Sequence, residues 1–296
     1  MTRNSTFSDN QNLMLDDILF IVNPISGKNG RKAKAVSYLE SKGCRIAFTQ
    51  YAGHAEKMAR EASEGTVVAV GGDGTVNEVA RALAGTGRKM GIIPCGSGDG
   101  LARKLGLRVT PAKSLEIIEK GHTQKMDCGM INGKPFFSVC GVGLDAIVSE
   151  RFAKAGKRGV NTYITEALNE WKDFAPEHYL IDIDGIKMEK DAVLITVANS
   201  NQWGNGAKVA PHAETDDGKF DITIVSMFKT IEIPVLAAQL MDGHFDRNHK
   251  VECLRGEKVI IHRQSPGPAH FDGDFFETGK DIEISLLADK LDILVP

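Results

Sequence analysis

Three short segments in the first hundred residues combine glycine with polar side chains, and each follows a run of β-branched or aliphatic residues. They read Asn23-Pro24-Ile25-Ser26-Gly27-Lys28, Gly71-Gly72-Asp73-Gly74-Thr75 and Pro94-Cys95-Gly96-Ser97-Gly98-Asp99-Gly100. Glycine turns that open helices present unpaired N–H groups and the positive end of the helix dipole, and both attract phosphate. Three such turns at one edge of a sheet would form a cradle for a triphosphate.

Among the residues of these segments, Asp73 is the strongest candidate for a role in catalysis. An aspartate between glycines is often only a turn or helix-capping residue. At the start of a phosphate-binding helix, however, its carboxylate would suit a Mg²⁺ ligand or the acceptor of a hydroxyl proton. Lys28 and Arg31 nearby are interpreted as solvated charges, and Cys95 as a small packed residue.

The usual phosphate and metal motifs do not match this sequence. A Walker A loop ending at Gly27-Lys28 would need glycine at position 22 and serine or threonine at position 29, where the chain has Val22 and Asn29. The dinucleotide fingerprint fails because Leu101 stands where its last glycine would fall. The sequence has no HExxH spacing and no CxxC pair, so neither a metal hydrolase nor a zinc ribbon is indicated.

The elements that must position the glycine turns follow from the apolar pattern between residue 18 and about residue 120. Strands are predicted over 18–22, 45–50, 66–70 and 91–93, and helices over 31–42, 55–62 and 75–83. The last helix has apolar residues at i, i+3, i+4 and i+7 from Val76, which is typical of a helix with one buried face. Alternation of this kind predicts a parallel sheet flanked by helices, with ligands beyond the carboxyl ends of its strands.

The pattern changes at about residue 128. Strands are predicted over 136–139, 180–184, 192–198, 220–226, 258–263 and 281–287. Asp-Gly turns at 184–185, 217–218 and 272–273 separate several of them, and one helix is expected over 161–174. We therefore expect an α/β domain over residues 16–127 and a mostly antiparallel β-sandwich over 128–296, whose last residues pack back on the first domain. Residues 1–15 read as a disordered polar tail.

Composition excludes several classes of protein. The 296 residues are 42% hydrophobic and 25% charged, close to the average for a globular protein. The sequence contains no run of about 18 apolar residues, which is the length that a helix needs to span a bilayer. The net charge of −3 gives no motive for binding nucleic acid, and five scattered cysteines suggest no disulfide framework. A cytoplasmic location is the expectation.

Several motifs together resemble one known family. Residues 71–79, Gly-Gly-Asp-Gly-Thr-Val-Asn-Glu-Val, look like the signature of the diacylglycerol kinase and sphingosine kinase superfamily. The first and third glycine turns resemble that family's nucleotide loops, and Thr49-x-x-x-Gly53-His54-Ala55 resembles its second nucleotide segment. The second half agrees at 141–146, 198–211 and 216–218. The resemblance runs from residue 18 to about 290 with all motifs in order.

The resemblance implies a bacterial-type lipid kinase that transfers the γ-phosphate of ATP to a lipid hydroxyl, with Mg²⁺ as cofactor. It implies a phosphofructokinase-like first domain, a lipid-binding β-sandwich, and an active site in the cleft between them. Asp73 and Asp274 are the implied catalytic residues, Asp73 and Asp217 the metal ligands, and Asp145 the lipid-binding residue. The implied nucleotide-binding residues lie in the glycine turns and the second segment: Asn23, Pro24, Ser26, Gly27, Thr49, Gly71, Gly72, Gly74, Thr75, Glu78, Gly96, Ser97 and Gly98.

Two positions depart from the family pattern. Asp99 replaces the usual asparagine of the third loop, which places a negative charge near the expected phosphates. Asp274 replaces the glutamate of the family's Asp-Gly-Glu and shortens the carboxylate's reach by one methylene. Two other functions therefore stay open. One is a kinase of small molecules that resembles NAD kinase or phosphofructokinase, and the other is a nucleotide- or lipid-binding relative without catalysis.

The identity of the lipid substrate is the most specific prediction. Ser97 at the middle of the third loop looks like the sphingosine kinase branch, and a buried Asp145 would pair with the ammonium of a long-chain base. An aspartate near this position also looks familiar among bacterial diacylglycerol-type kinases, so a sphingoid base is favoured only narrowly over diacylglycerol. Contact with the membrane is expected to be peripheral, and a homodimer is left open.

Overall fold

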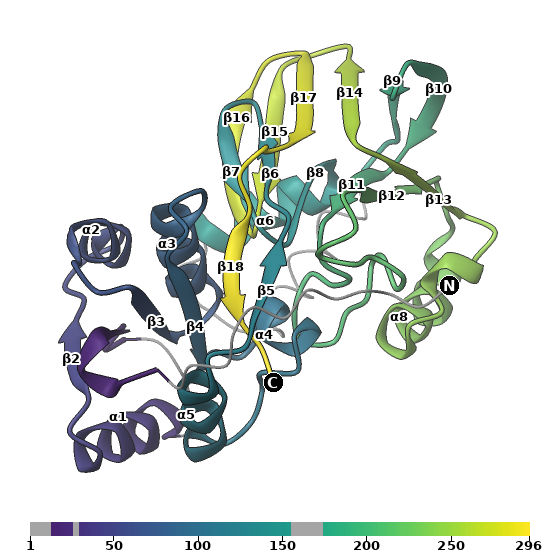
Figure 1. Cartoon of the computed structure of the whole chain (residues 1–296). Helices are drawn as coiled ribbons and strands as arrows, with labels where there is room; N and C mark the ends of the chain where they lie inside the picture. The colour runs from purple at the N-terminus through teal and green to yellow at the C-terminus, as the bar shows by residue number, and fades with distance from the viewer. Residues whose placement is uncertain (1–12, 26–29, 155–173) are drawn as a thin grey trace, which may run out of the picture. The chain divides into compact units, whose positions relative to one another are not determined.

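The computed structural model describes residues 13–25, 30–154 and 174–296, and it divides into two compact units (Figure 1). The first unit comprises residues 1–126 together with 289–296, and the second comprises residues 127–288. The expected Ser26 and Gly27 and nearly all of the expected helix over 161–174 lie outside the described residues.

The first unit contains a six-stranded sheet in the order β2-β1-β3-β4-β18-β5. Its strands are β1 (Ile18–Val22), β2 (Arg45–Phe48), β3 (Thr66–Gly71), β4 (Lys89–Pro94), β5 (Thr123–Met126) and β18 (Leu291–Leu294). The first four are parallel, as the alternation of strands and helices predicts. β18, which ends the chain, pairs parallel with β4 and antiparallel with β5.

Helices pack against this sheet, and its central strands β1 and β3 are therefore buried along their whole length, as in other parallel sheets. The helices are α1 (Arg31–Ser41), α2 (His54–Glu61), α3 (Asp73–Leu83), α4 (Gly100–Lys104) and α5 (Pro111–Lys120), after the short turn η1 (Leu15–Asp17). Phe20 and Val68 of the sheet share one core with Leu39 of α1 and Ile118 of α5. α3 buries Val76, Val79, Ala80 and Leu83, the stripe that the sequence predicts.

The second unit is built from two six-stranded antiparallel sheets, which confirms the expected β-sandwich. One sheet has the order β10-β9-β14-β17-β6-β7 and the other β13-β12-β11-β8-β15-β16. The strands of the first are β6 (Gly129–Ile131), β7 (Lys134–Phe136), β9 (Glu177–Ile183), β10 (Ile186–Ala192), β14 (Lys258–Arg263) and β17 (Asp281–Leu286). Those of the second are β8 (Val139–Gly143), β11 (Leu194–Ala198), β12 (Phe220–Val225), β13 (Val251–Gly256), β15 (Gly267–Phe271) and β16 (Asp274–Thr278).

The core of the second unit lies between its two sheets. Phe136 of one sheet stacks on Phe220 of the other with ring centroids 5.5 Å apart, and Tyr179 and Val142 belong to the same cluster. The remaining described elements are the helices α6 (Leu144–Lys154) and α8 (Ile233–Asp242) and the short turns η2 (Thr230–Glu232) and η3 (Phe245–Arg247). α6 follows directly on β8, so the buried strand end delivers Asp145 into the first turn of this helix.

Two segments that were predicted as single strands are each divided between two elements. The strand expected over 136–139 is broken after Phe136, and β8 begins only at Val139, because the N–H groups of Phe137 and Ser138 bond to a side chain instead of a neighbouring strand. The strand expected over 192–198 belongs to two elements, since Ala192 ends β10 and Leu194 begins β11. The sequence analysis also did not predict the helices α5, α6 and α8 or the strands β5, β6, β10, β13, β15, β16 and β18.

Candidate active site

The second and third glycine turns pack directly against each other at the carboxyl ends of β3 and β4. The N–H of Cys95 donates to the carbonyl of Gly71 at 2.7 Å. A β-carbon on Gly96 would lie only 2.8 Å from the Cα of Gly72, so neither turn has room for a side chain at this contact. The sequence therefore needs glycine here to bring two backbones together, and the prediction that both turns meet at one edge of the sheet is confirmed.

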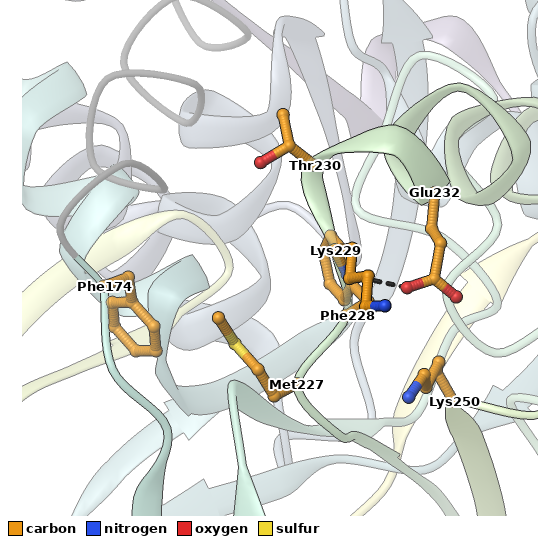
Figure 2. Close-up of a pocket in the computed structure, with 7 residues that line it drawn as sticks. All are labelled: Phe174, Met227, Phe228, Lys229, Thr230, Glu232 and Lys250. Atoms are coloured by element: carbon orange, nitrogen blue, oxygen red, sulfur yellow. Dashed lines mark hydrogen bonds between the residues drawn. The ribbon is translucent and has the colours of Figure 1, made fainter.

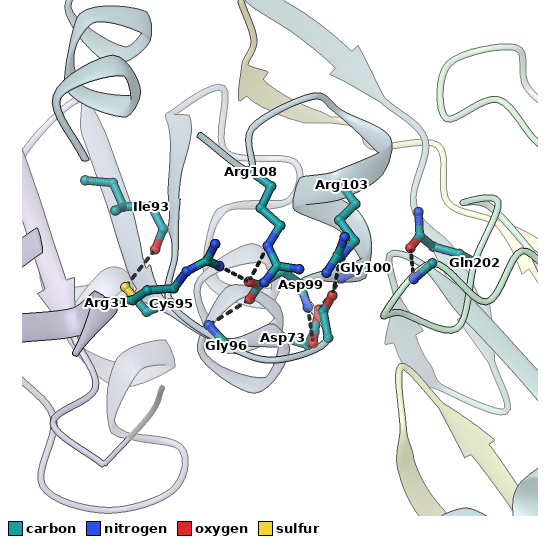
Figure 3. Close-up of polar contacts among 12 residues, drawn as sticks. Arg31, Asp73, Ile93, Cys95, Gly96, Asp99, Gly100, Arg103, Arg108 and Gln202 are labelled. Atoms are coloured by element: carbon teal, nitrogen blue, oxygen red, sulfur yellow. Dashed lines mark hydrogen bonds and ion pairs between the residues drawn. The ribbon is translucent and has the colours of Figure 1, made fainter. Parts of the chain in front are cut away.

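Asp73 joins these two turns. It is the first residue of α3, and its carboxylate accepts the N–H of Asp99 at 2.9 Å and that of Gly100 at 2.7 Å (Figure 3). A β-carbon on Gly98 would lie 2.6 Å from its Oδ2 atom, which leaves glycine as the residue that fits. Burial raises the pKa of Asp73, while the two donated N–H groups act against that rise. Asp73 thus caps the next helix, α4, rather than its own.

Glu78, one helical turn further along α3, does the same for α2. Its carboxylate oxygens accept the N–H of Gly53 at 2.8 Å and the N–H of Ala55 at 2.9 Å. Gly53 has a φ of 84°, a conformation that favours glycine, and it precedes the first residue of α2. The two acids of the 71–79 motif therefore fix the starts of the neighbouring helices. Contact of Glu78 with nucleotide stays a prediction.

The third turn is less open to a phosphate than the sequence suggests. The N–H groups of Asp99 and Gly100 are bonded to Asp73, and the N–H of Gly96 donates to Asp99 Oδ1 at 2.9 Å. These are the groups at the start of a helix that the sequence reasoning expects to face a ligand. Protein carboxylates already hold these three groups, so a phosphate bound here needs donors other than the N–H groups of Gly96, Asp99 and Gly100.

Asp99 is a buried carboxylate between two arginines. The residue is 2% exposed and has a φ of 49°, a left-handed conformation in which aspartate and asparagine are tolerated. Its Oδ2 lies 3.8 Å from Arg31 Nη1 and 3.7 Å from Arg108 Nε. Burial and the nearby Asp73 raise the pKa of Asp99 to about 6, against the Gly96 N–H and Arg31. Arg31 is therefore more than the solvated charge that its sequence context suggests, and Arg108 was missed.

The described part of the first loop, residues 23–25, and the second segment are held by nearby hydrogen bonds. Asn23 accepts the N–H of Ile25 on its side-chain oxygen at 3.0 Å, and Lys32 donates to the carbonyl of Pro24. Thr49 is buried and donates its N–H to the carbonyl of Val22 at 2.9 Å, which ties this segment to the end of β1. Asn23, Pro24 and Thr49 therefore lie at the sheet edge that carries the second and third turns.

In the second unit, Asp272 has a structural role that the sequence did not reveal. Its carboxylate accepts the N–H groups of Phe137 at 2.8 Å, Ser138 at 2.7 Å and Val139 at 3.1 Å. These donors fill the gap between β7 and β8, so Asp272 joins the β15–β16 hairpin to that break. Asp274 begins β16 and is exposed, which leaves its catalytic role a prediction.

Asp145 is 3% exposed and has three partners inside the second unit. Its Oδ1 accepts the N–H of Ala146 at 2.8 Å. Its Oδ2 accepts the hydroxyl of Thr196 at 2.8 Å and lies 3.0 Å from Nε2 of His270, which is equally buried. Because both oxygens of this carboxylate already have partners within the protein, it does not need the ammonium group of a lipid as a counter-charge. This weakens the argument for a sphingoid base.

Asp217 has a cationic neighbour where a metal ion was expected. Its Oδ2 pairs with Arg255, its Oδ1 accepts the N–H of Lys219 at 3.1 Å, and Arg255 also lies 3.4 Å from Asp221. Within the described residues, no group of three or more histidine, cysteine, aspartate or glutamate side chains is placed to hold a metal ion. The metal role of Asp217 therefore stays a prediction that its ion pair does not favour.

A pocket of about 510 Å³ lies in the second unit between η2 and the chain just before β13 (Figure 2). Phe174, Met227 and Phe228 supply its apolar side, and the charged side chains of Lys229, Glu232 and Lys250 line the rest. Phe174 and Phe228 also pack against Leu144 and Val148 of α6, the helix that carries Asp145.

No helix in the described ranges is long and apolar enough to cross a membrane.

Comparison with known proteins gives the same family from both halves of the chain. Residues 17–131 match the model of the diacylglycerol kinase catalytic domain, and residues 138–288 match that of the YegS C-terminal NAD kinase beta sandwich-like domain. A diacylglycerol kinase of Mycobacterium tuberculosis is 30% identical over 250 residues, which cover 81% of this chain and 80% of that one.

Solved structures agree on the fold. A diacylglycerol kinase structure from Bacillus anthracis has a TM-score of 0.71 at 21% identity and covers 99% of this chain and 98% of its own. An NAD kinase from Archaeoglobus fulgidus in complex with ATP has a TM-score of 0.52 at 12% identity and covers 94% and 93%. Because a relative as similar as the mycobacterial protein spans four fifths of both chains, and both domain models match, this chain belongs to the bacterial lipid kinases of the diacylglycerol kinase and sphingosine kinase superfamily.

Proposed function

We propose that this protein transfers the γ-phosphate of ATP to the hydroxyl of a membrane lipid. The observation that carries the proposal is the position of Asp73, a half-buried residue whose carboxylate lies at the contact between two glycine turns that have no room for side chains. Phosphoryl transfer has a loose transition state, so catalysis depends mainly on positioning and on neutralising charge. A rigid backbone surface around one carboxylate suits that task.

Mg²⁺ fits the residues at this edge of the first unit. Proteins hold Mg²⁺ with one or two carboxylates and leave the remaining positions to substrate phosphates and water, so a dedicated cage of acids is not required. Asp73 would hold the ion, directly or through water. When bound, Mg²⁺ neutralises the charge that develops on the transferred phosphoryl group.

For the acceptor we propose diacylglycerol ahead of a sphingoid base. Asp145 was the residue expected to recognise the ammonium group of a long-chain base, and it has three internal partners instead. A neutral glycerol hydroxyl needs no such counter-charge. The mycobacterial relative is itself named a diacylglycerol kinase, which supports this order.

Contact with the membrane is the second part of the proposal. The apolar side of the pocket, with Lys229 and Lys250 beside it and the exposed Ile231 and Val235 nearby in sequence, would suit weak and reversible attachment to a bilayer. Flotation with liposomes should then depend on lipid composition and on salt. Tight attachment that resists high salt would contradict a peripheral contact.

The test is a panel of acceptors incubated with γ-labelled ATP and Mg²⁺. Diacylglycerol, a long-chain base, ceramide and undecaprenol are offered in mixed micelles, and NAD and a fructose phosphate are offered in solution, with product mass measured. We expect phosphorylated diacylglycerol as the main product. Labelled NADP or fructose bisphosphate without labelled lipid would identify a small-molecule kinase. The absence of any labelled product at high enzyme concentration would identify a binding protein without catalysis.

A further inference from the structure

Two arginines and one aspartate form a compact charged cluster beside the third glycine turn. Arg31 begins α1, Arg108 lies between α4 and α5, and both guanidinium groups approach the same Oδ2 atom of Asp99 (Figure 3). The other carboxylate oxygen of Asp99 holds the N–H of Gly96, so the cluster is tied to the turn itself. Residues far apart in sequence thus bring two positive charges to one point.

The contacts within this cluster are ion pairs and not hydrogen bonds. At 3.7 and 3.8 Å, the nitrogen–oxygen distances exceed hydrogen-bond length. Among the side chains that the structure describes, Asp99 Oδ2 and Arg108 Nη1 are both buried and have no hydrogen-bond partner. Buried donors of this kind are costly unless a partner arrives. Among the described residues, Nη1 of Arg108 is a guanidinium donor that no group uses.

Asp99 keeps the two guanidinium groups together. Two like charges repel each other, and a carboxylate between them offsets much of that repulsion. The N–H groups of Gly96, Asp99 and Gly100 are already bonded to Asp73 and Asp99, so these three do not serve a phosphate at this point. Arg31 and Arg108 are charged donors beside the same turn.

We propose that Arg108 and Arg31 bind a phosphate of the nucleotide beside the third glycine turn, and that Asp99 is the positioning residue that holds their guanidinium groups there. The proposal rests on the proposed function, because it takes ATP as the substrate. The planar fork of a guanidinium matches phosphate oxygens, which a solvated lysine would not do as well. The negative charge at position 99 then serves the arginines and does not oppose the nucleotide.

The first experiment measures the equilibrium Kd for ATP and for adenosine. Arg108→Gln should raise the Kd for ATP on the order of tenfold or more, and Arg31→Gln somewhat less, because Arg31 is 46% exposed and Arg108 only 23%. Adenosine binding should not change in either variant. Arg60→Gln is the matched control, since Arg60 lies in the same unit and pairs with Glu56 of its own helix. Its Kd for ATP should stay within about twofold of the wild-type value.

The second experiment tests the positioning role of Asp99 with a double-mutant cycle. Asp99→Asn keeps a side-chain oxygen for the Gly96 N–H, so this substitution should preserve the turn and change only the charge. We expect Asp99→Asn to raise the Kd for ATP about fivefold in the wild-type background, and to leave it unchanged or lower it in the Arg108→Gln background. A purely electrostatic Asp99 would instead tighten ATP binding by the same factor in both backgrounds.

Each outcome decides between distinct accounts. If the wild-type protein binds ATP and phosphorylates lipid while Arg108→Gln keeps the wild-type Kd, the arginine site is wrong and the proposed function stands. If the wild-type protein binds no ATP, both fail together. Arg108→Lys covers the case in which the glutamine variant does not fold, because lysine keeps the charge and loses the fork. An intermediate Kd would support the proposal, and an unchanged one would overturn it.

Discussion

The motif carboxylates of the two units differ in burial and in partners: Asp73 and Glu78 are half-buried, whereas Asp145 is buried. In the first unit, Asp73 and Glu78 accept backbone N–H groups at the starts of neighbouring helices, and so they shape the glycine surface around them. In the second unit, Asp145 bonds mainly to the side chains of Thr196 and His270 inside a packed sandwich. The motif aspartate of the first unit thus joins two glycine turns, whereas that of the second unit is part of a core.

This difference gives the carboxylates different expected functions. If the proposed function is right, an acid that holds the backbone of two glycine turns together should affect turnover when it is replaced. An acid that is satisfied by buried side chains should affect stability first.

The largest effect is expected for Asp73→Asn. The variant should fold, since the side chain is nearly isosteric, but kcat should fall by roughly a thousandfold or more because metal and proton handling are lost. The readout is kcat with melting temperature measured in parallel. Asp182→Asn, which alters a carboxylate bonded only to the N–H of Gly185 in the β9–β10 turn, should leave kcat unchanged. A folded Asp73→Asn variant with normal kcat would refute the assignment.

The next effect separates two neighbours in one hairpin. Asp272→Ala leaves three backbone N–H groups without their acceptor and should lower the free energy of unfolding by about 3 kcal/mol. Asp274→Ala, at an exposed position, should cost less than about 0.5 kcal/mol yet reduce kcat by roughly a hundredfold while ATP affinity changes little. Denaturant unfolding and steady-state kinetics check both. Loss of ATP binding with turnover retained in Asp274→Ala would exclude a role as base.

A smaller effect is expected for Asp145→Asn. Because Asp145 is part of a buried network, we expect a loss of about 1–2 kcal/mol in stability and an equal decrease in kcat/KM for diacylglycerol and for a sphingoid base. Comparing the two lipids in wild type and variant isolates the question of the headgroup. A decrease confined to the sphingoid base would restore the ammonium pairing that the sequence suggests.

The smallest effect concerns the cysteines. Burial raises the pKa of the Cys95 thiol to about 11, so little thiolate exists at pH 8 and its alkylation should be slow until the pH approaches that value. Cys253, which is exposed, should react first in the folded protein. Mass spectrometry after timed alkylation checks the order. Cys95→Ser should leave kcat within about threefold, as expected for a packed residue; a much larger loss would argue for a chemical role.

The sequence predicted much of the fold because local patterns specify it. The strands over 18–22 and 258–263 are correct to the residue, and α1 differs from its prediction by one residue. Strands with polar or proline-containing sequences, such as β10 and β15, were missed since their residues alternate around a half-exposed sheet. The insertion of β18 between β4 and β5 depends on contacts nearly two hundred residues apart, which no local pattern encodes.

The sequence predicted which residues form the candidate site, but not the hydrogen bonds and ion pairs that they make. The glycine turns and Asp73 were found by type and spacing, and the structure brings them together. The sequence could not show that Asp73 holds the N–H groups of Asp99 and Gly100, or that Asp272 holds those of residues 137–139. The pairing of Asp99 with Arg108 likewise depends on the path of the chain after α4.

The central claim is that this protein transfers phosphate from ATP to a lipid through the Asp73 site. The most direct measurement is a single-turnover reaction with excess enzyme, γ-labelled ATP and diacylglycerol in mixed micelles, run with the wild-type protein and with Asp73→Asn. We predict that label enters the lipid in the wild-type reaction and that Asp73→Asn, although it is folded and binds ATP, transfers almost none. Equal transfer by both proteins, or labelled lipid from neither, would contradict the claim.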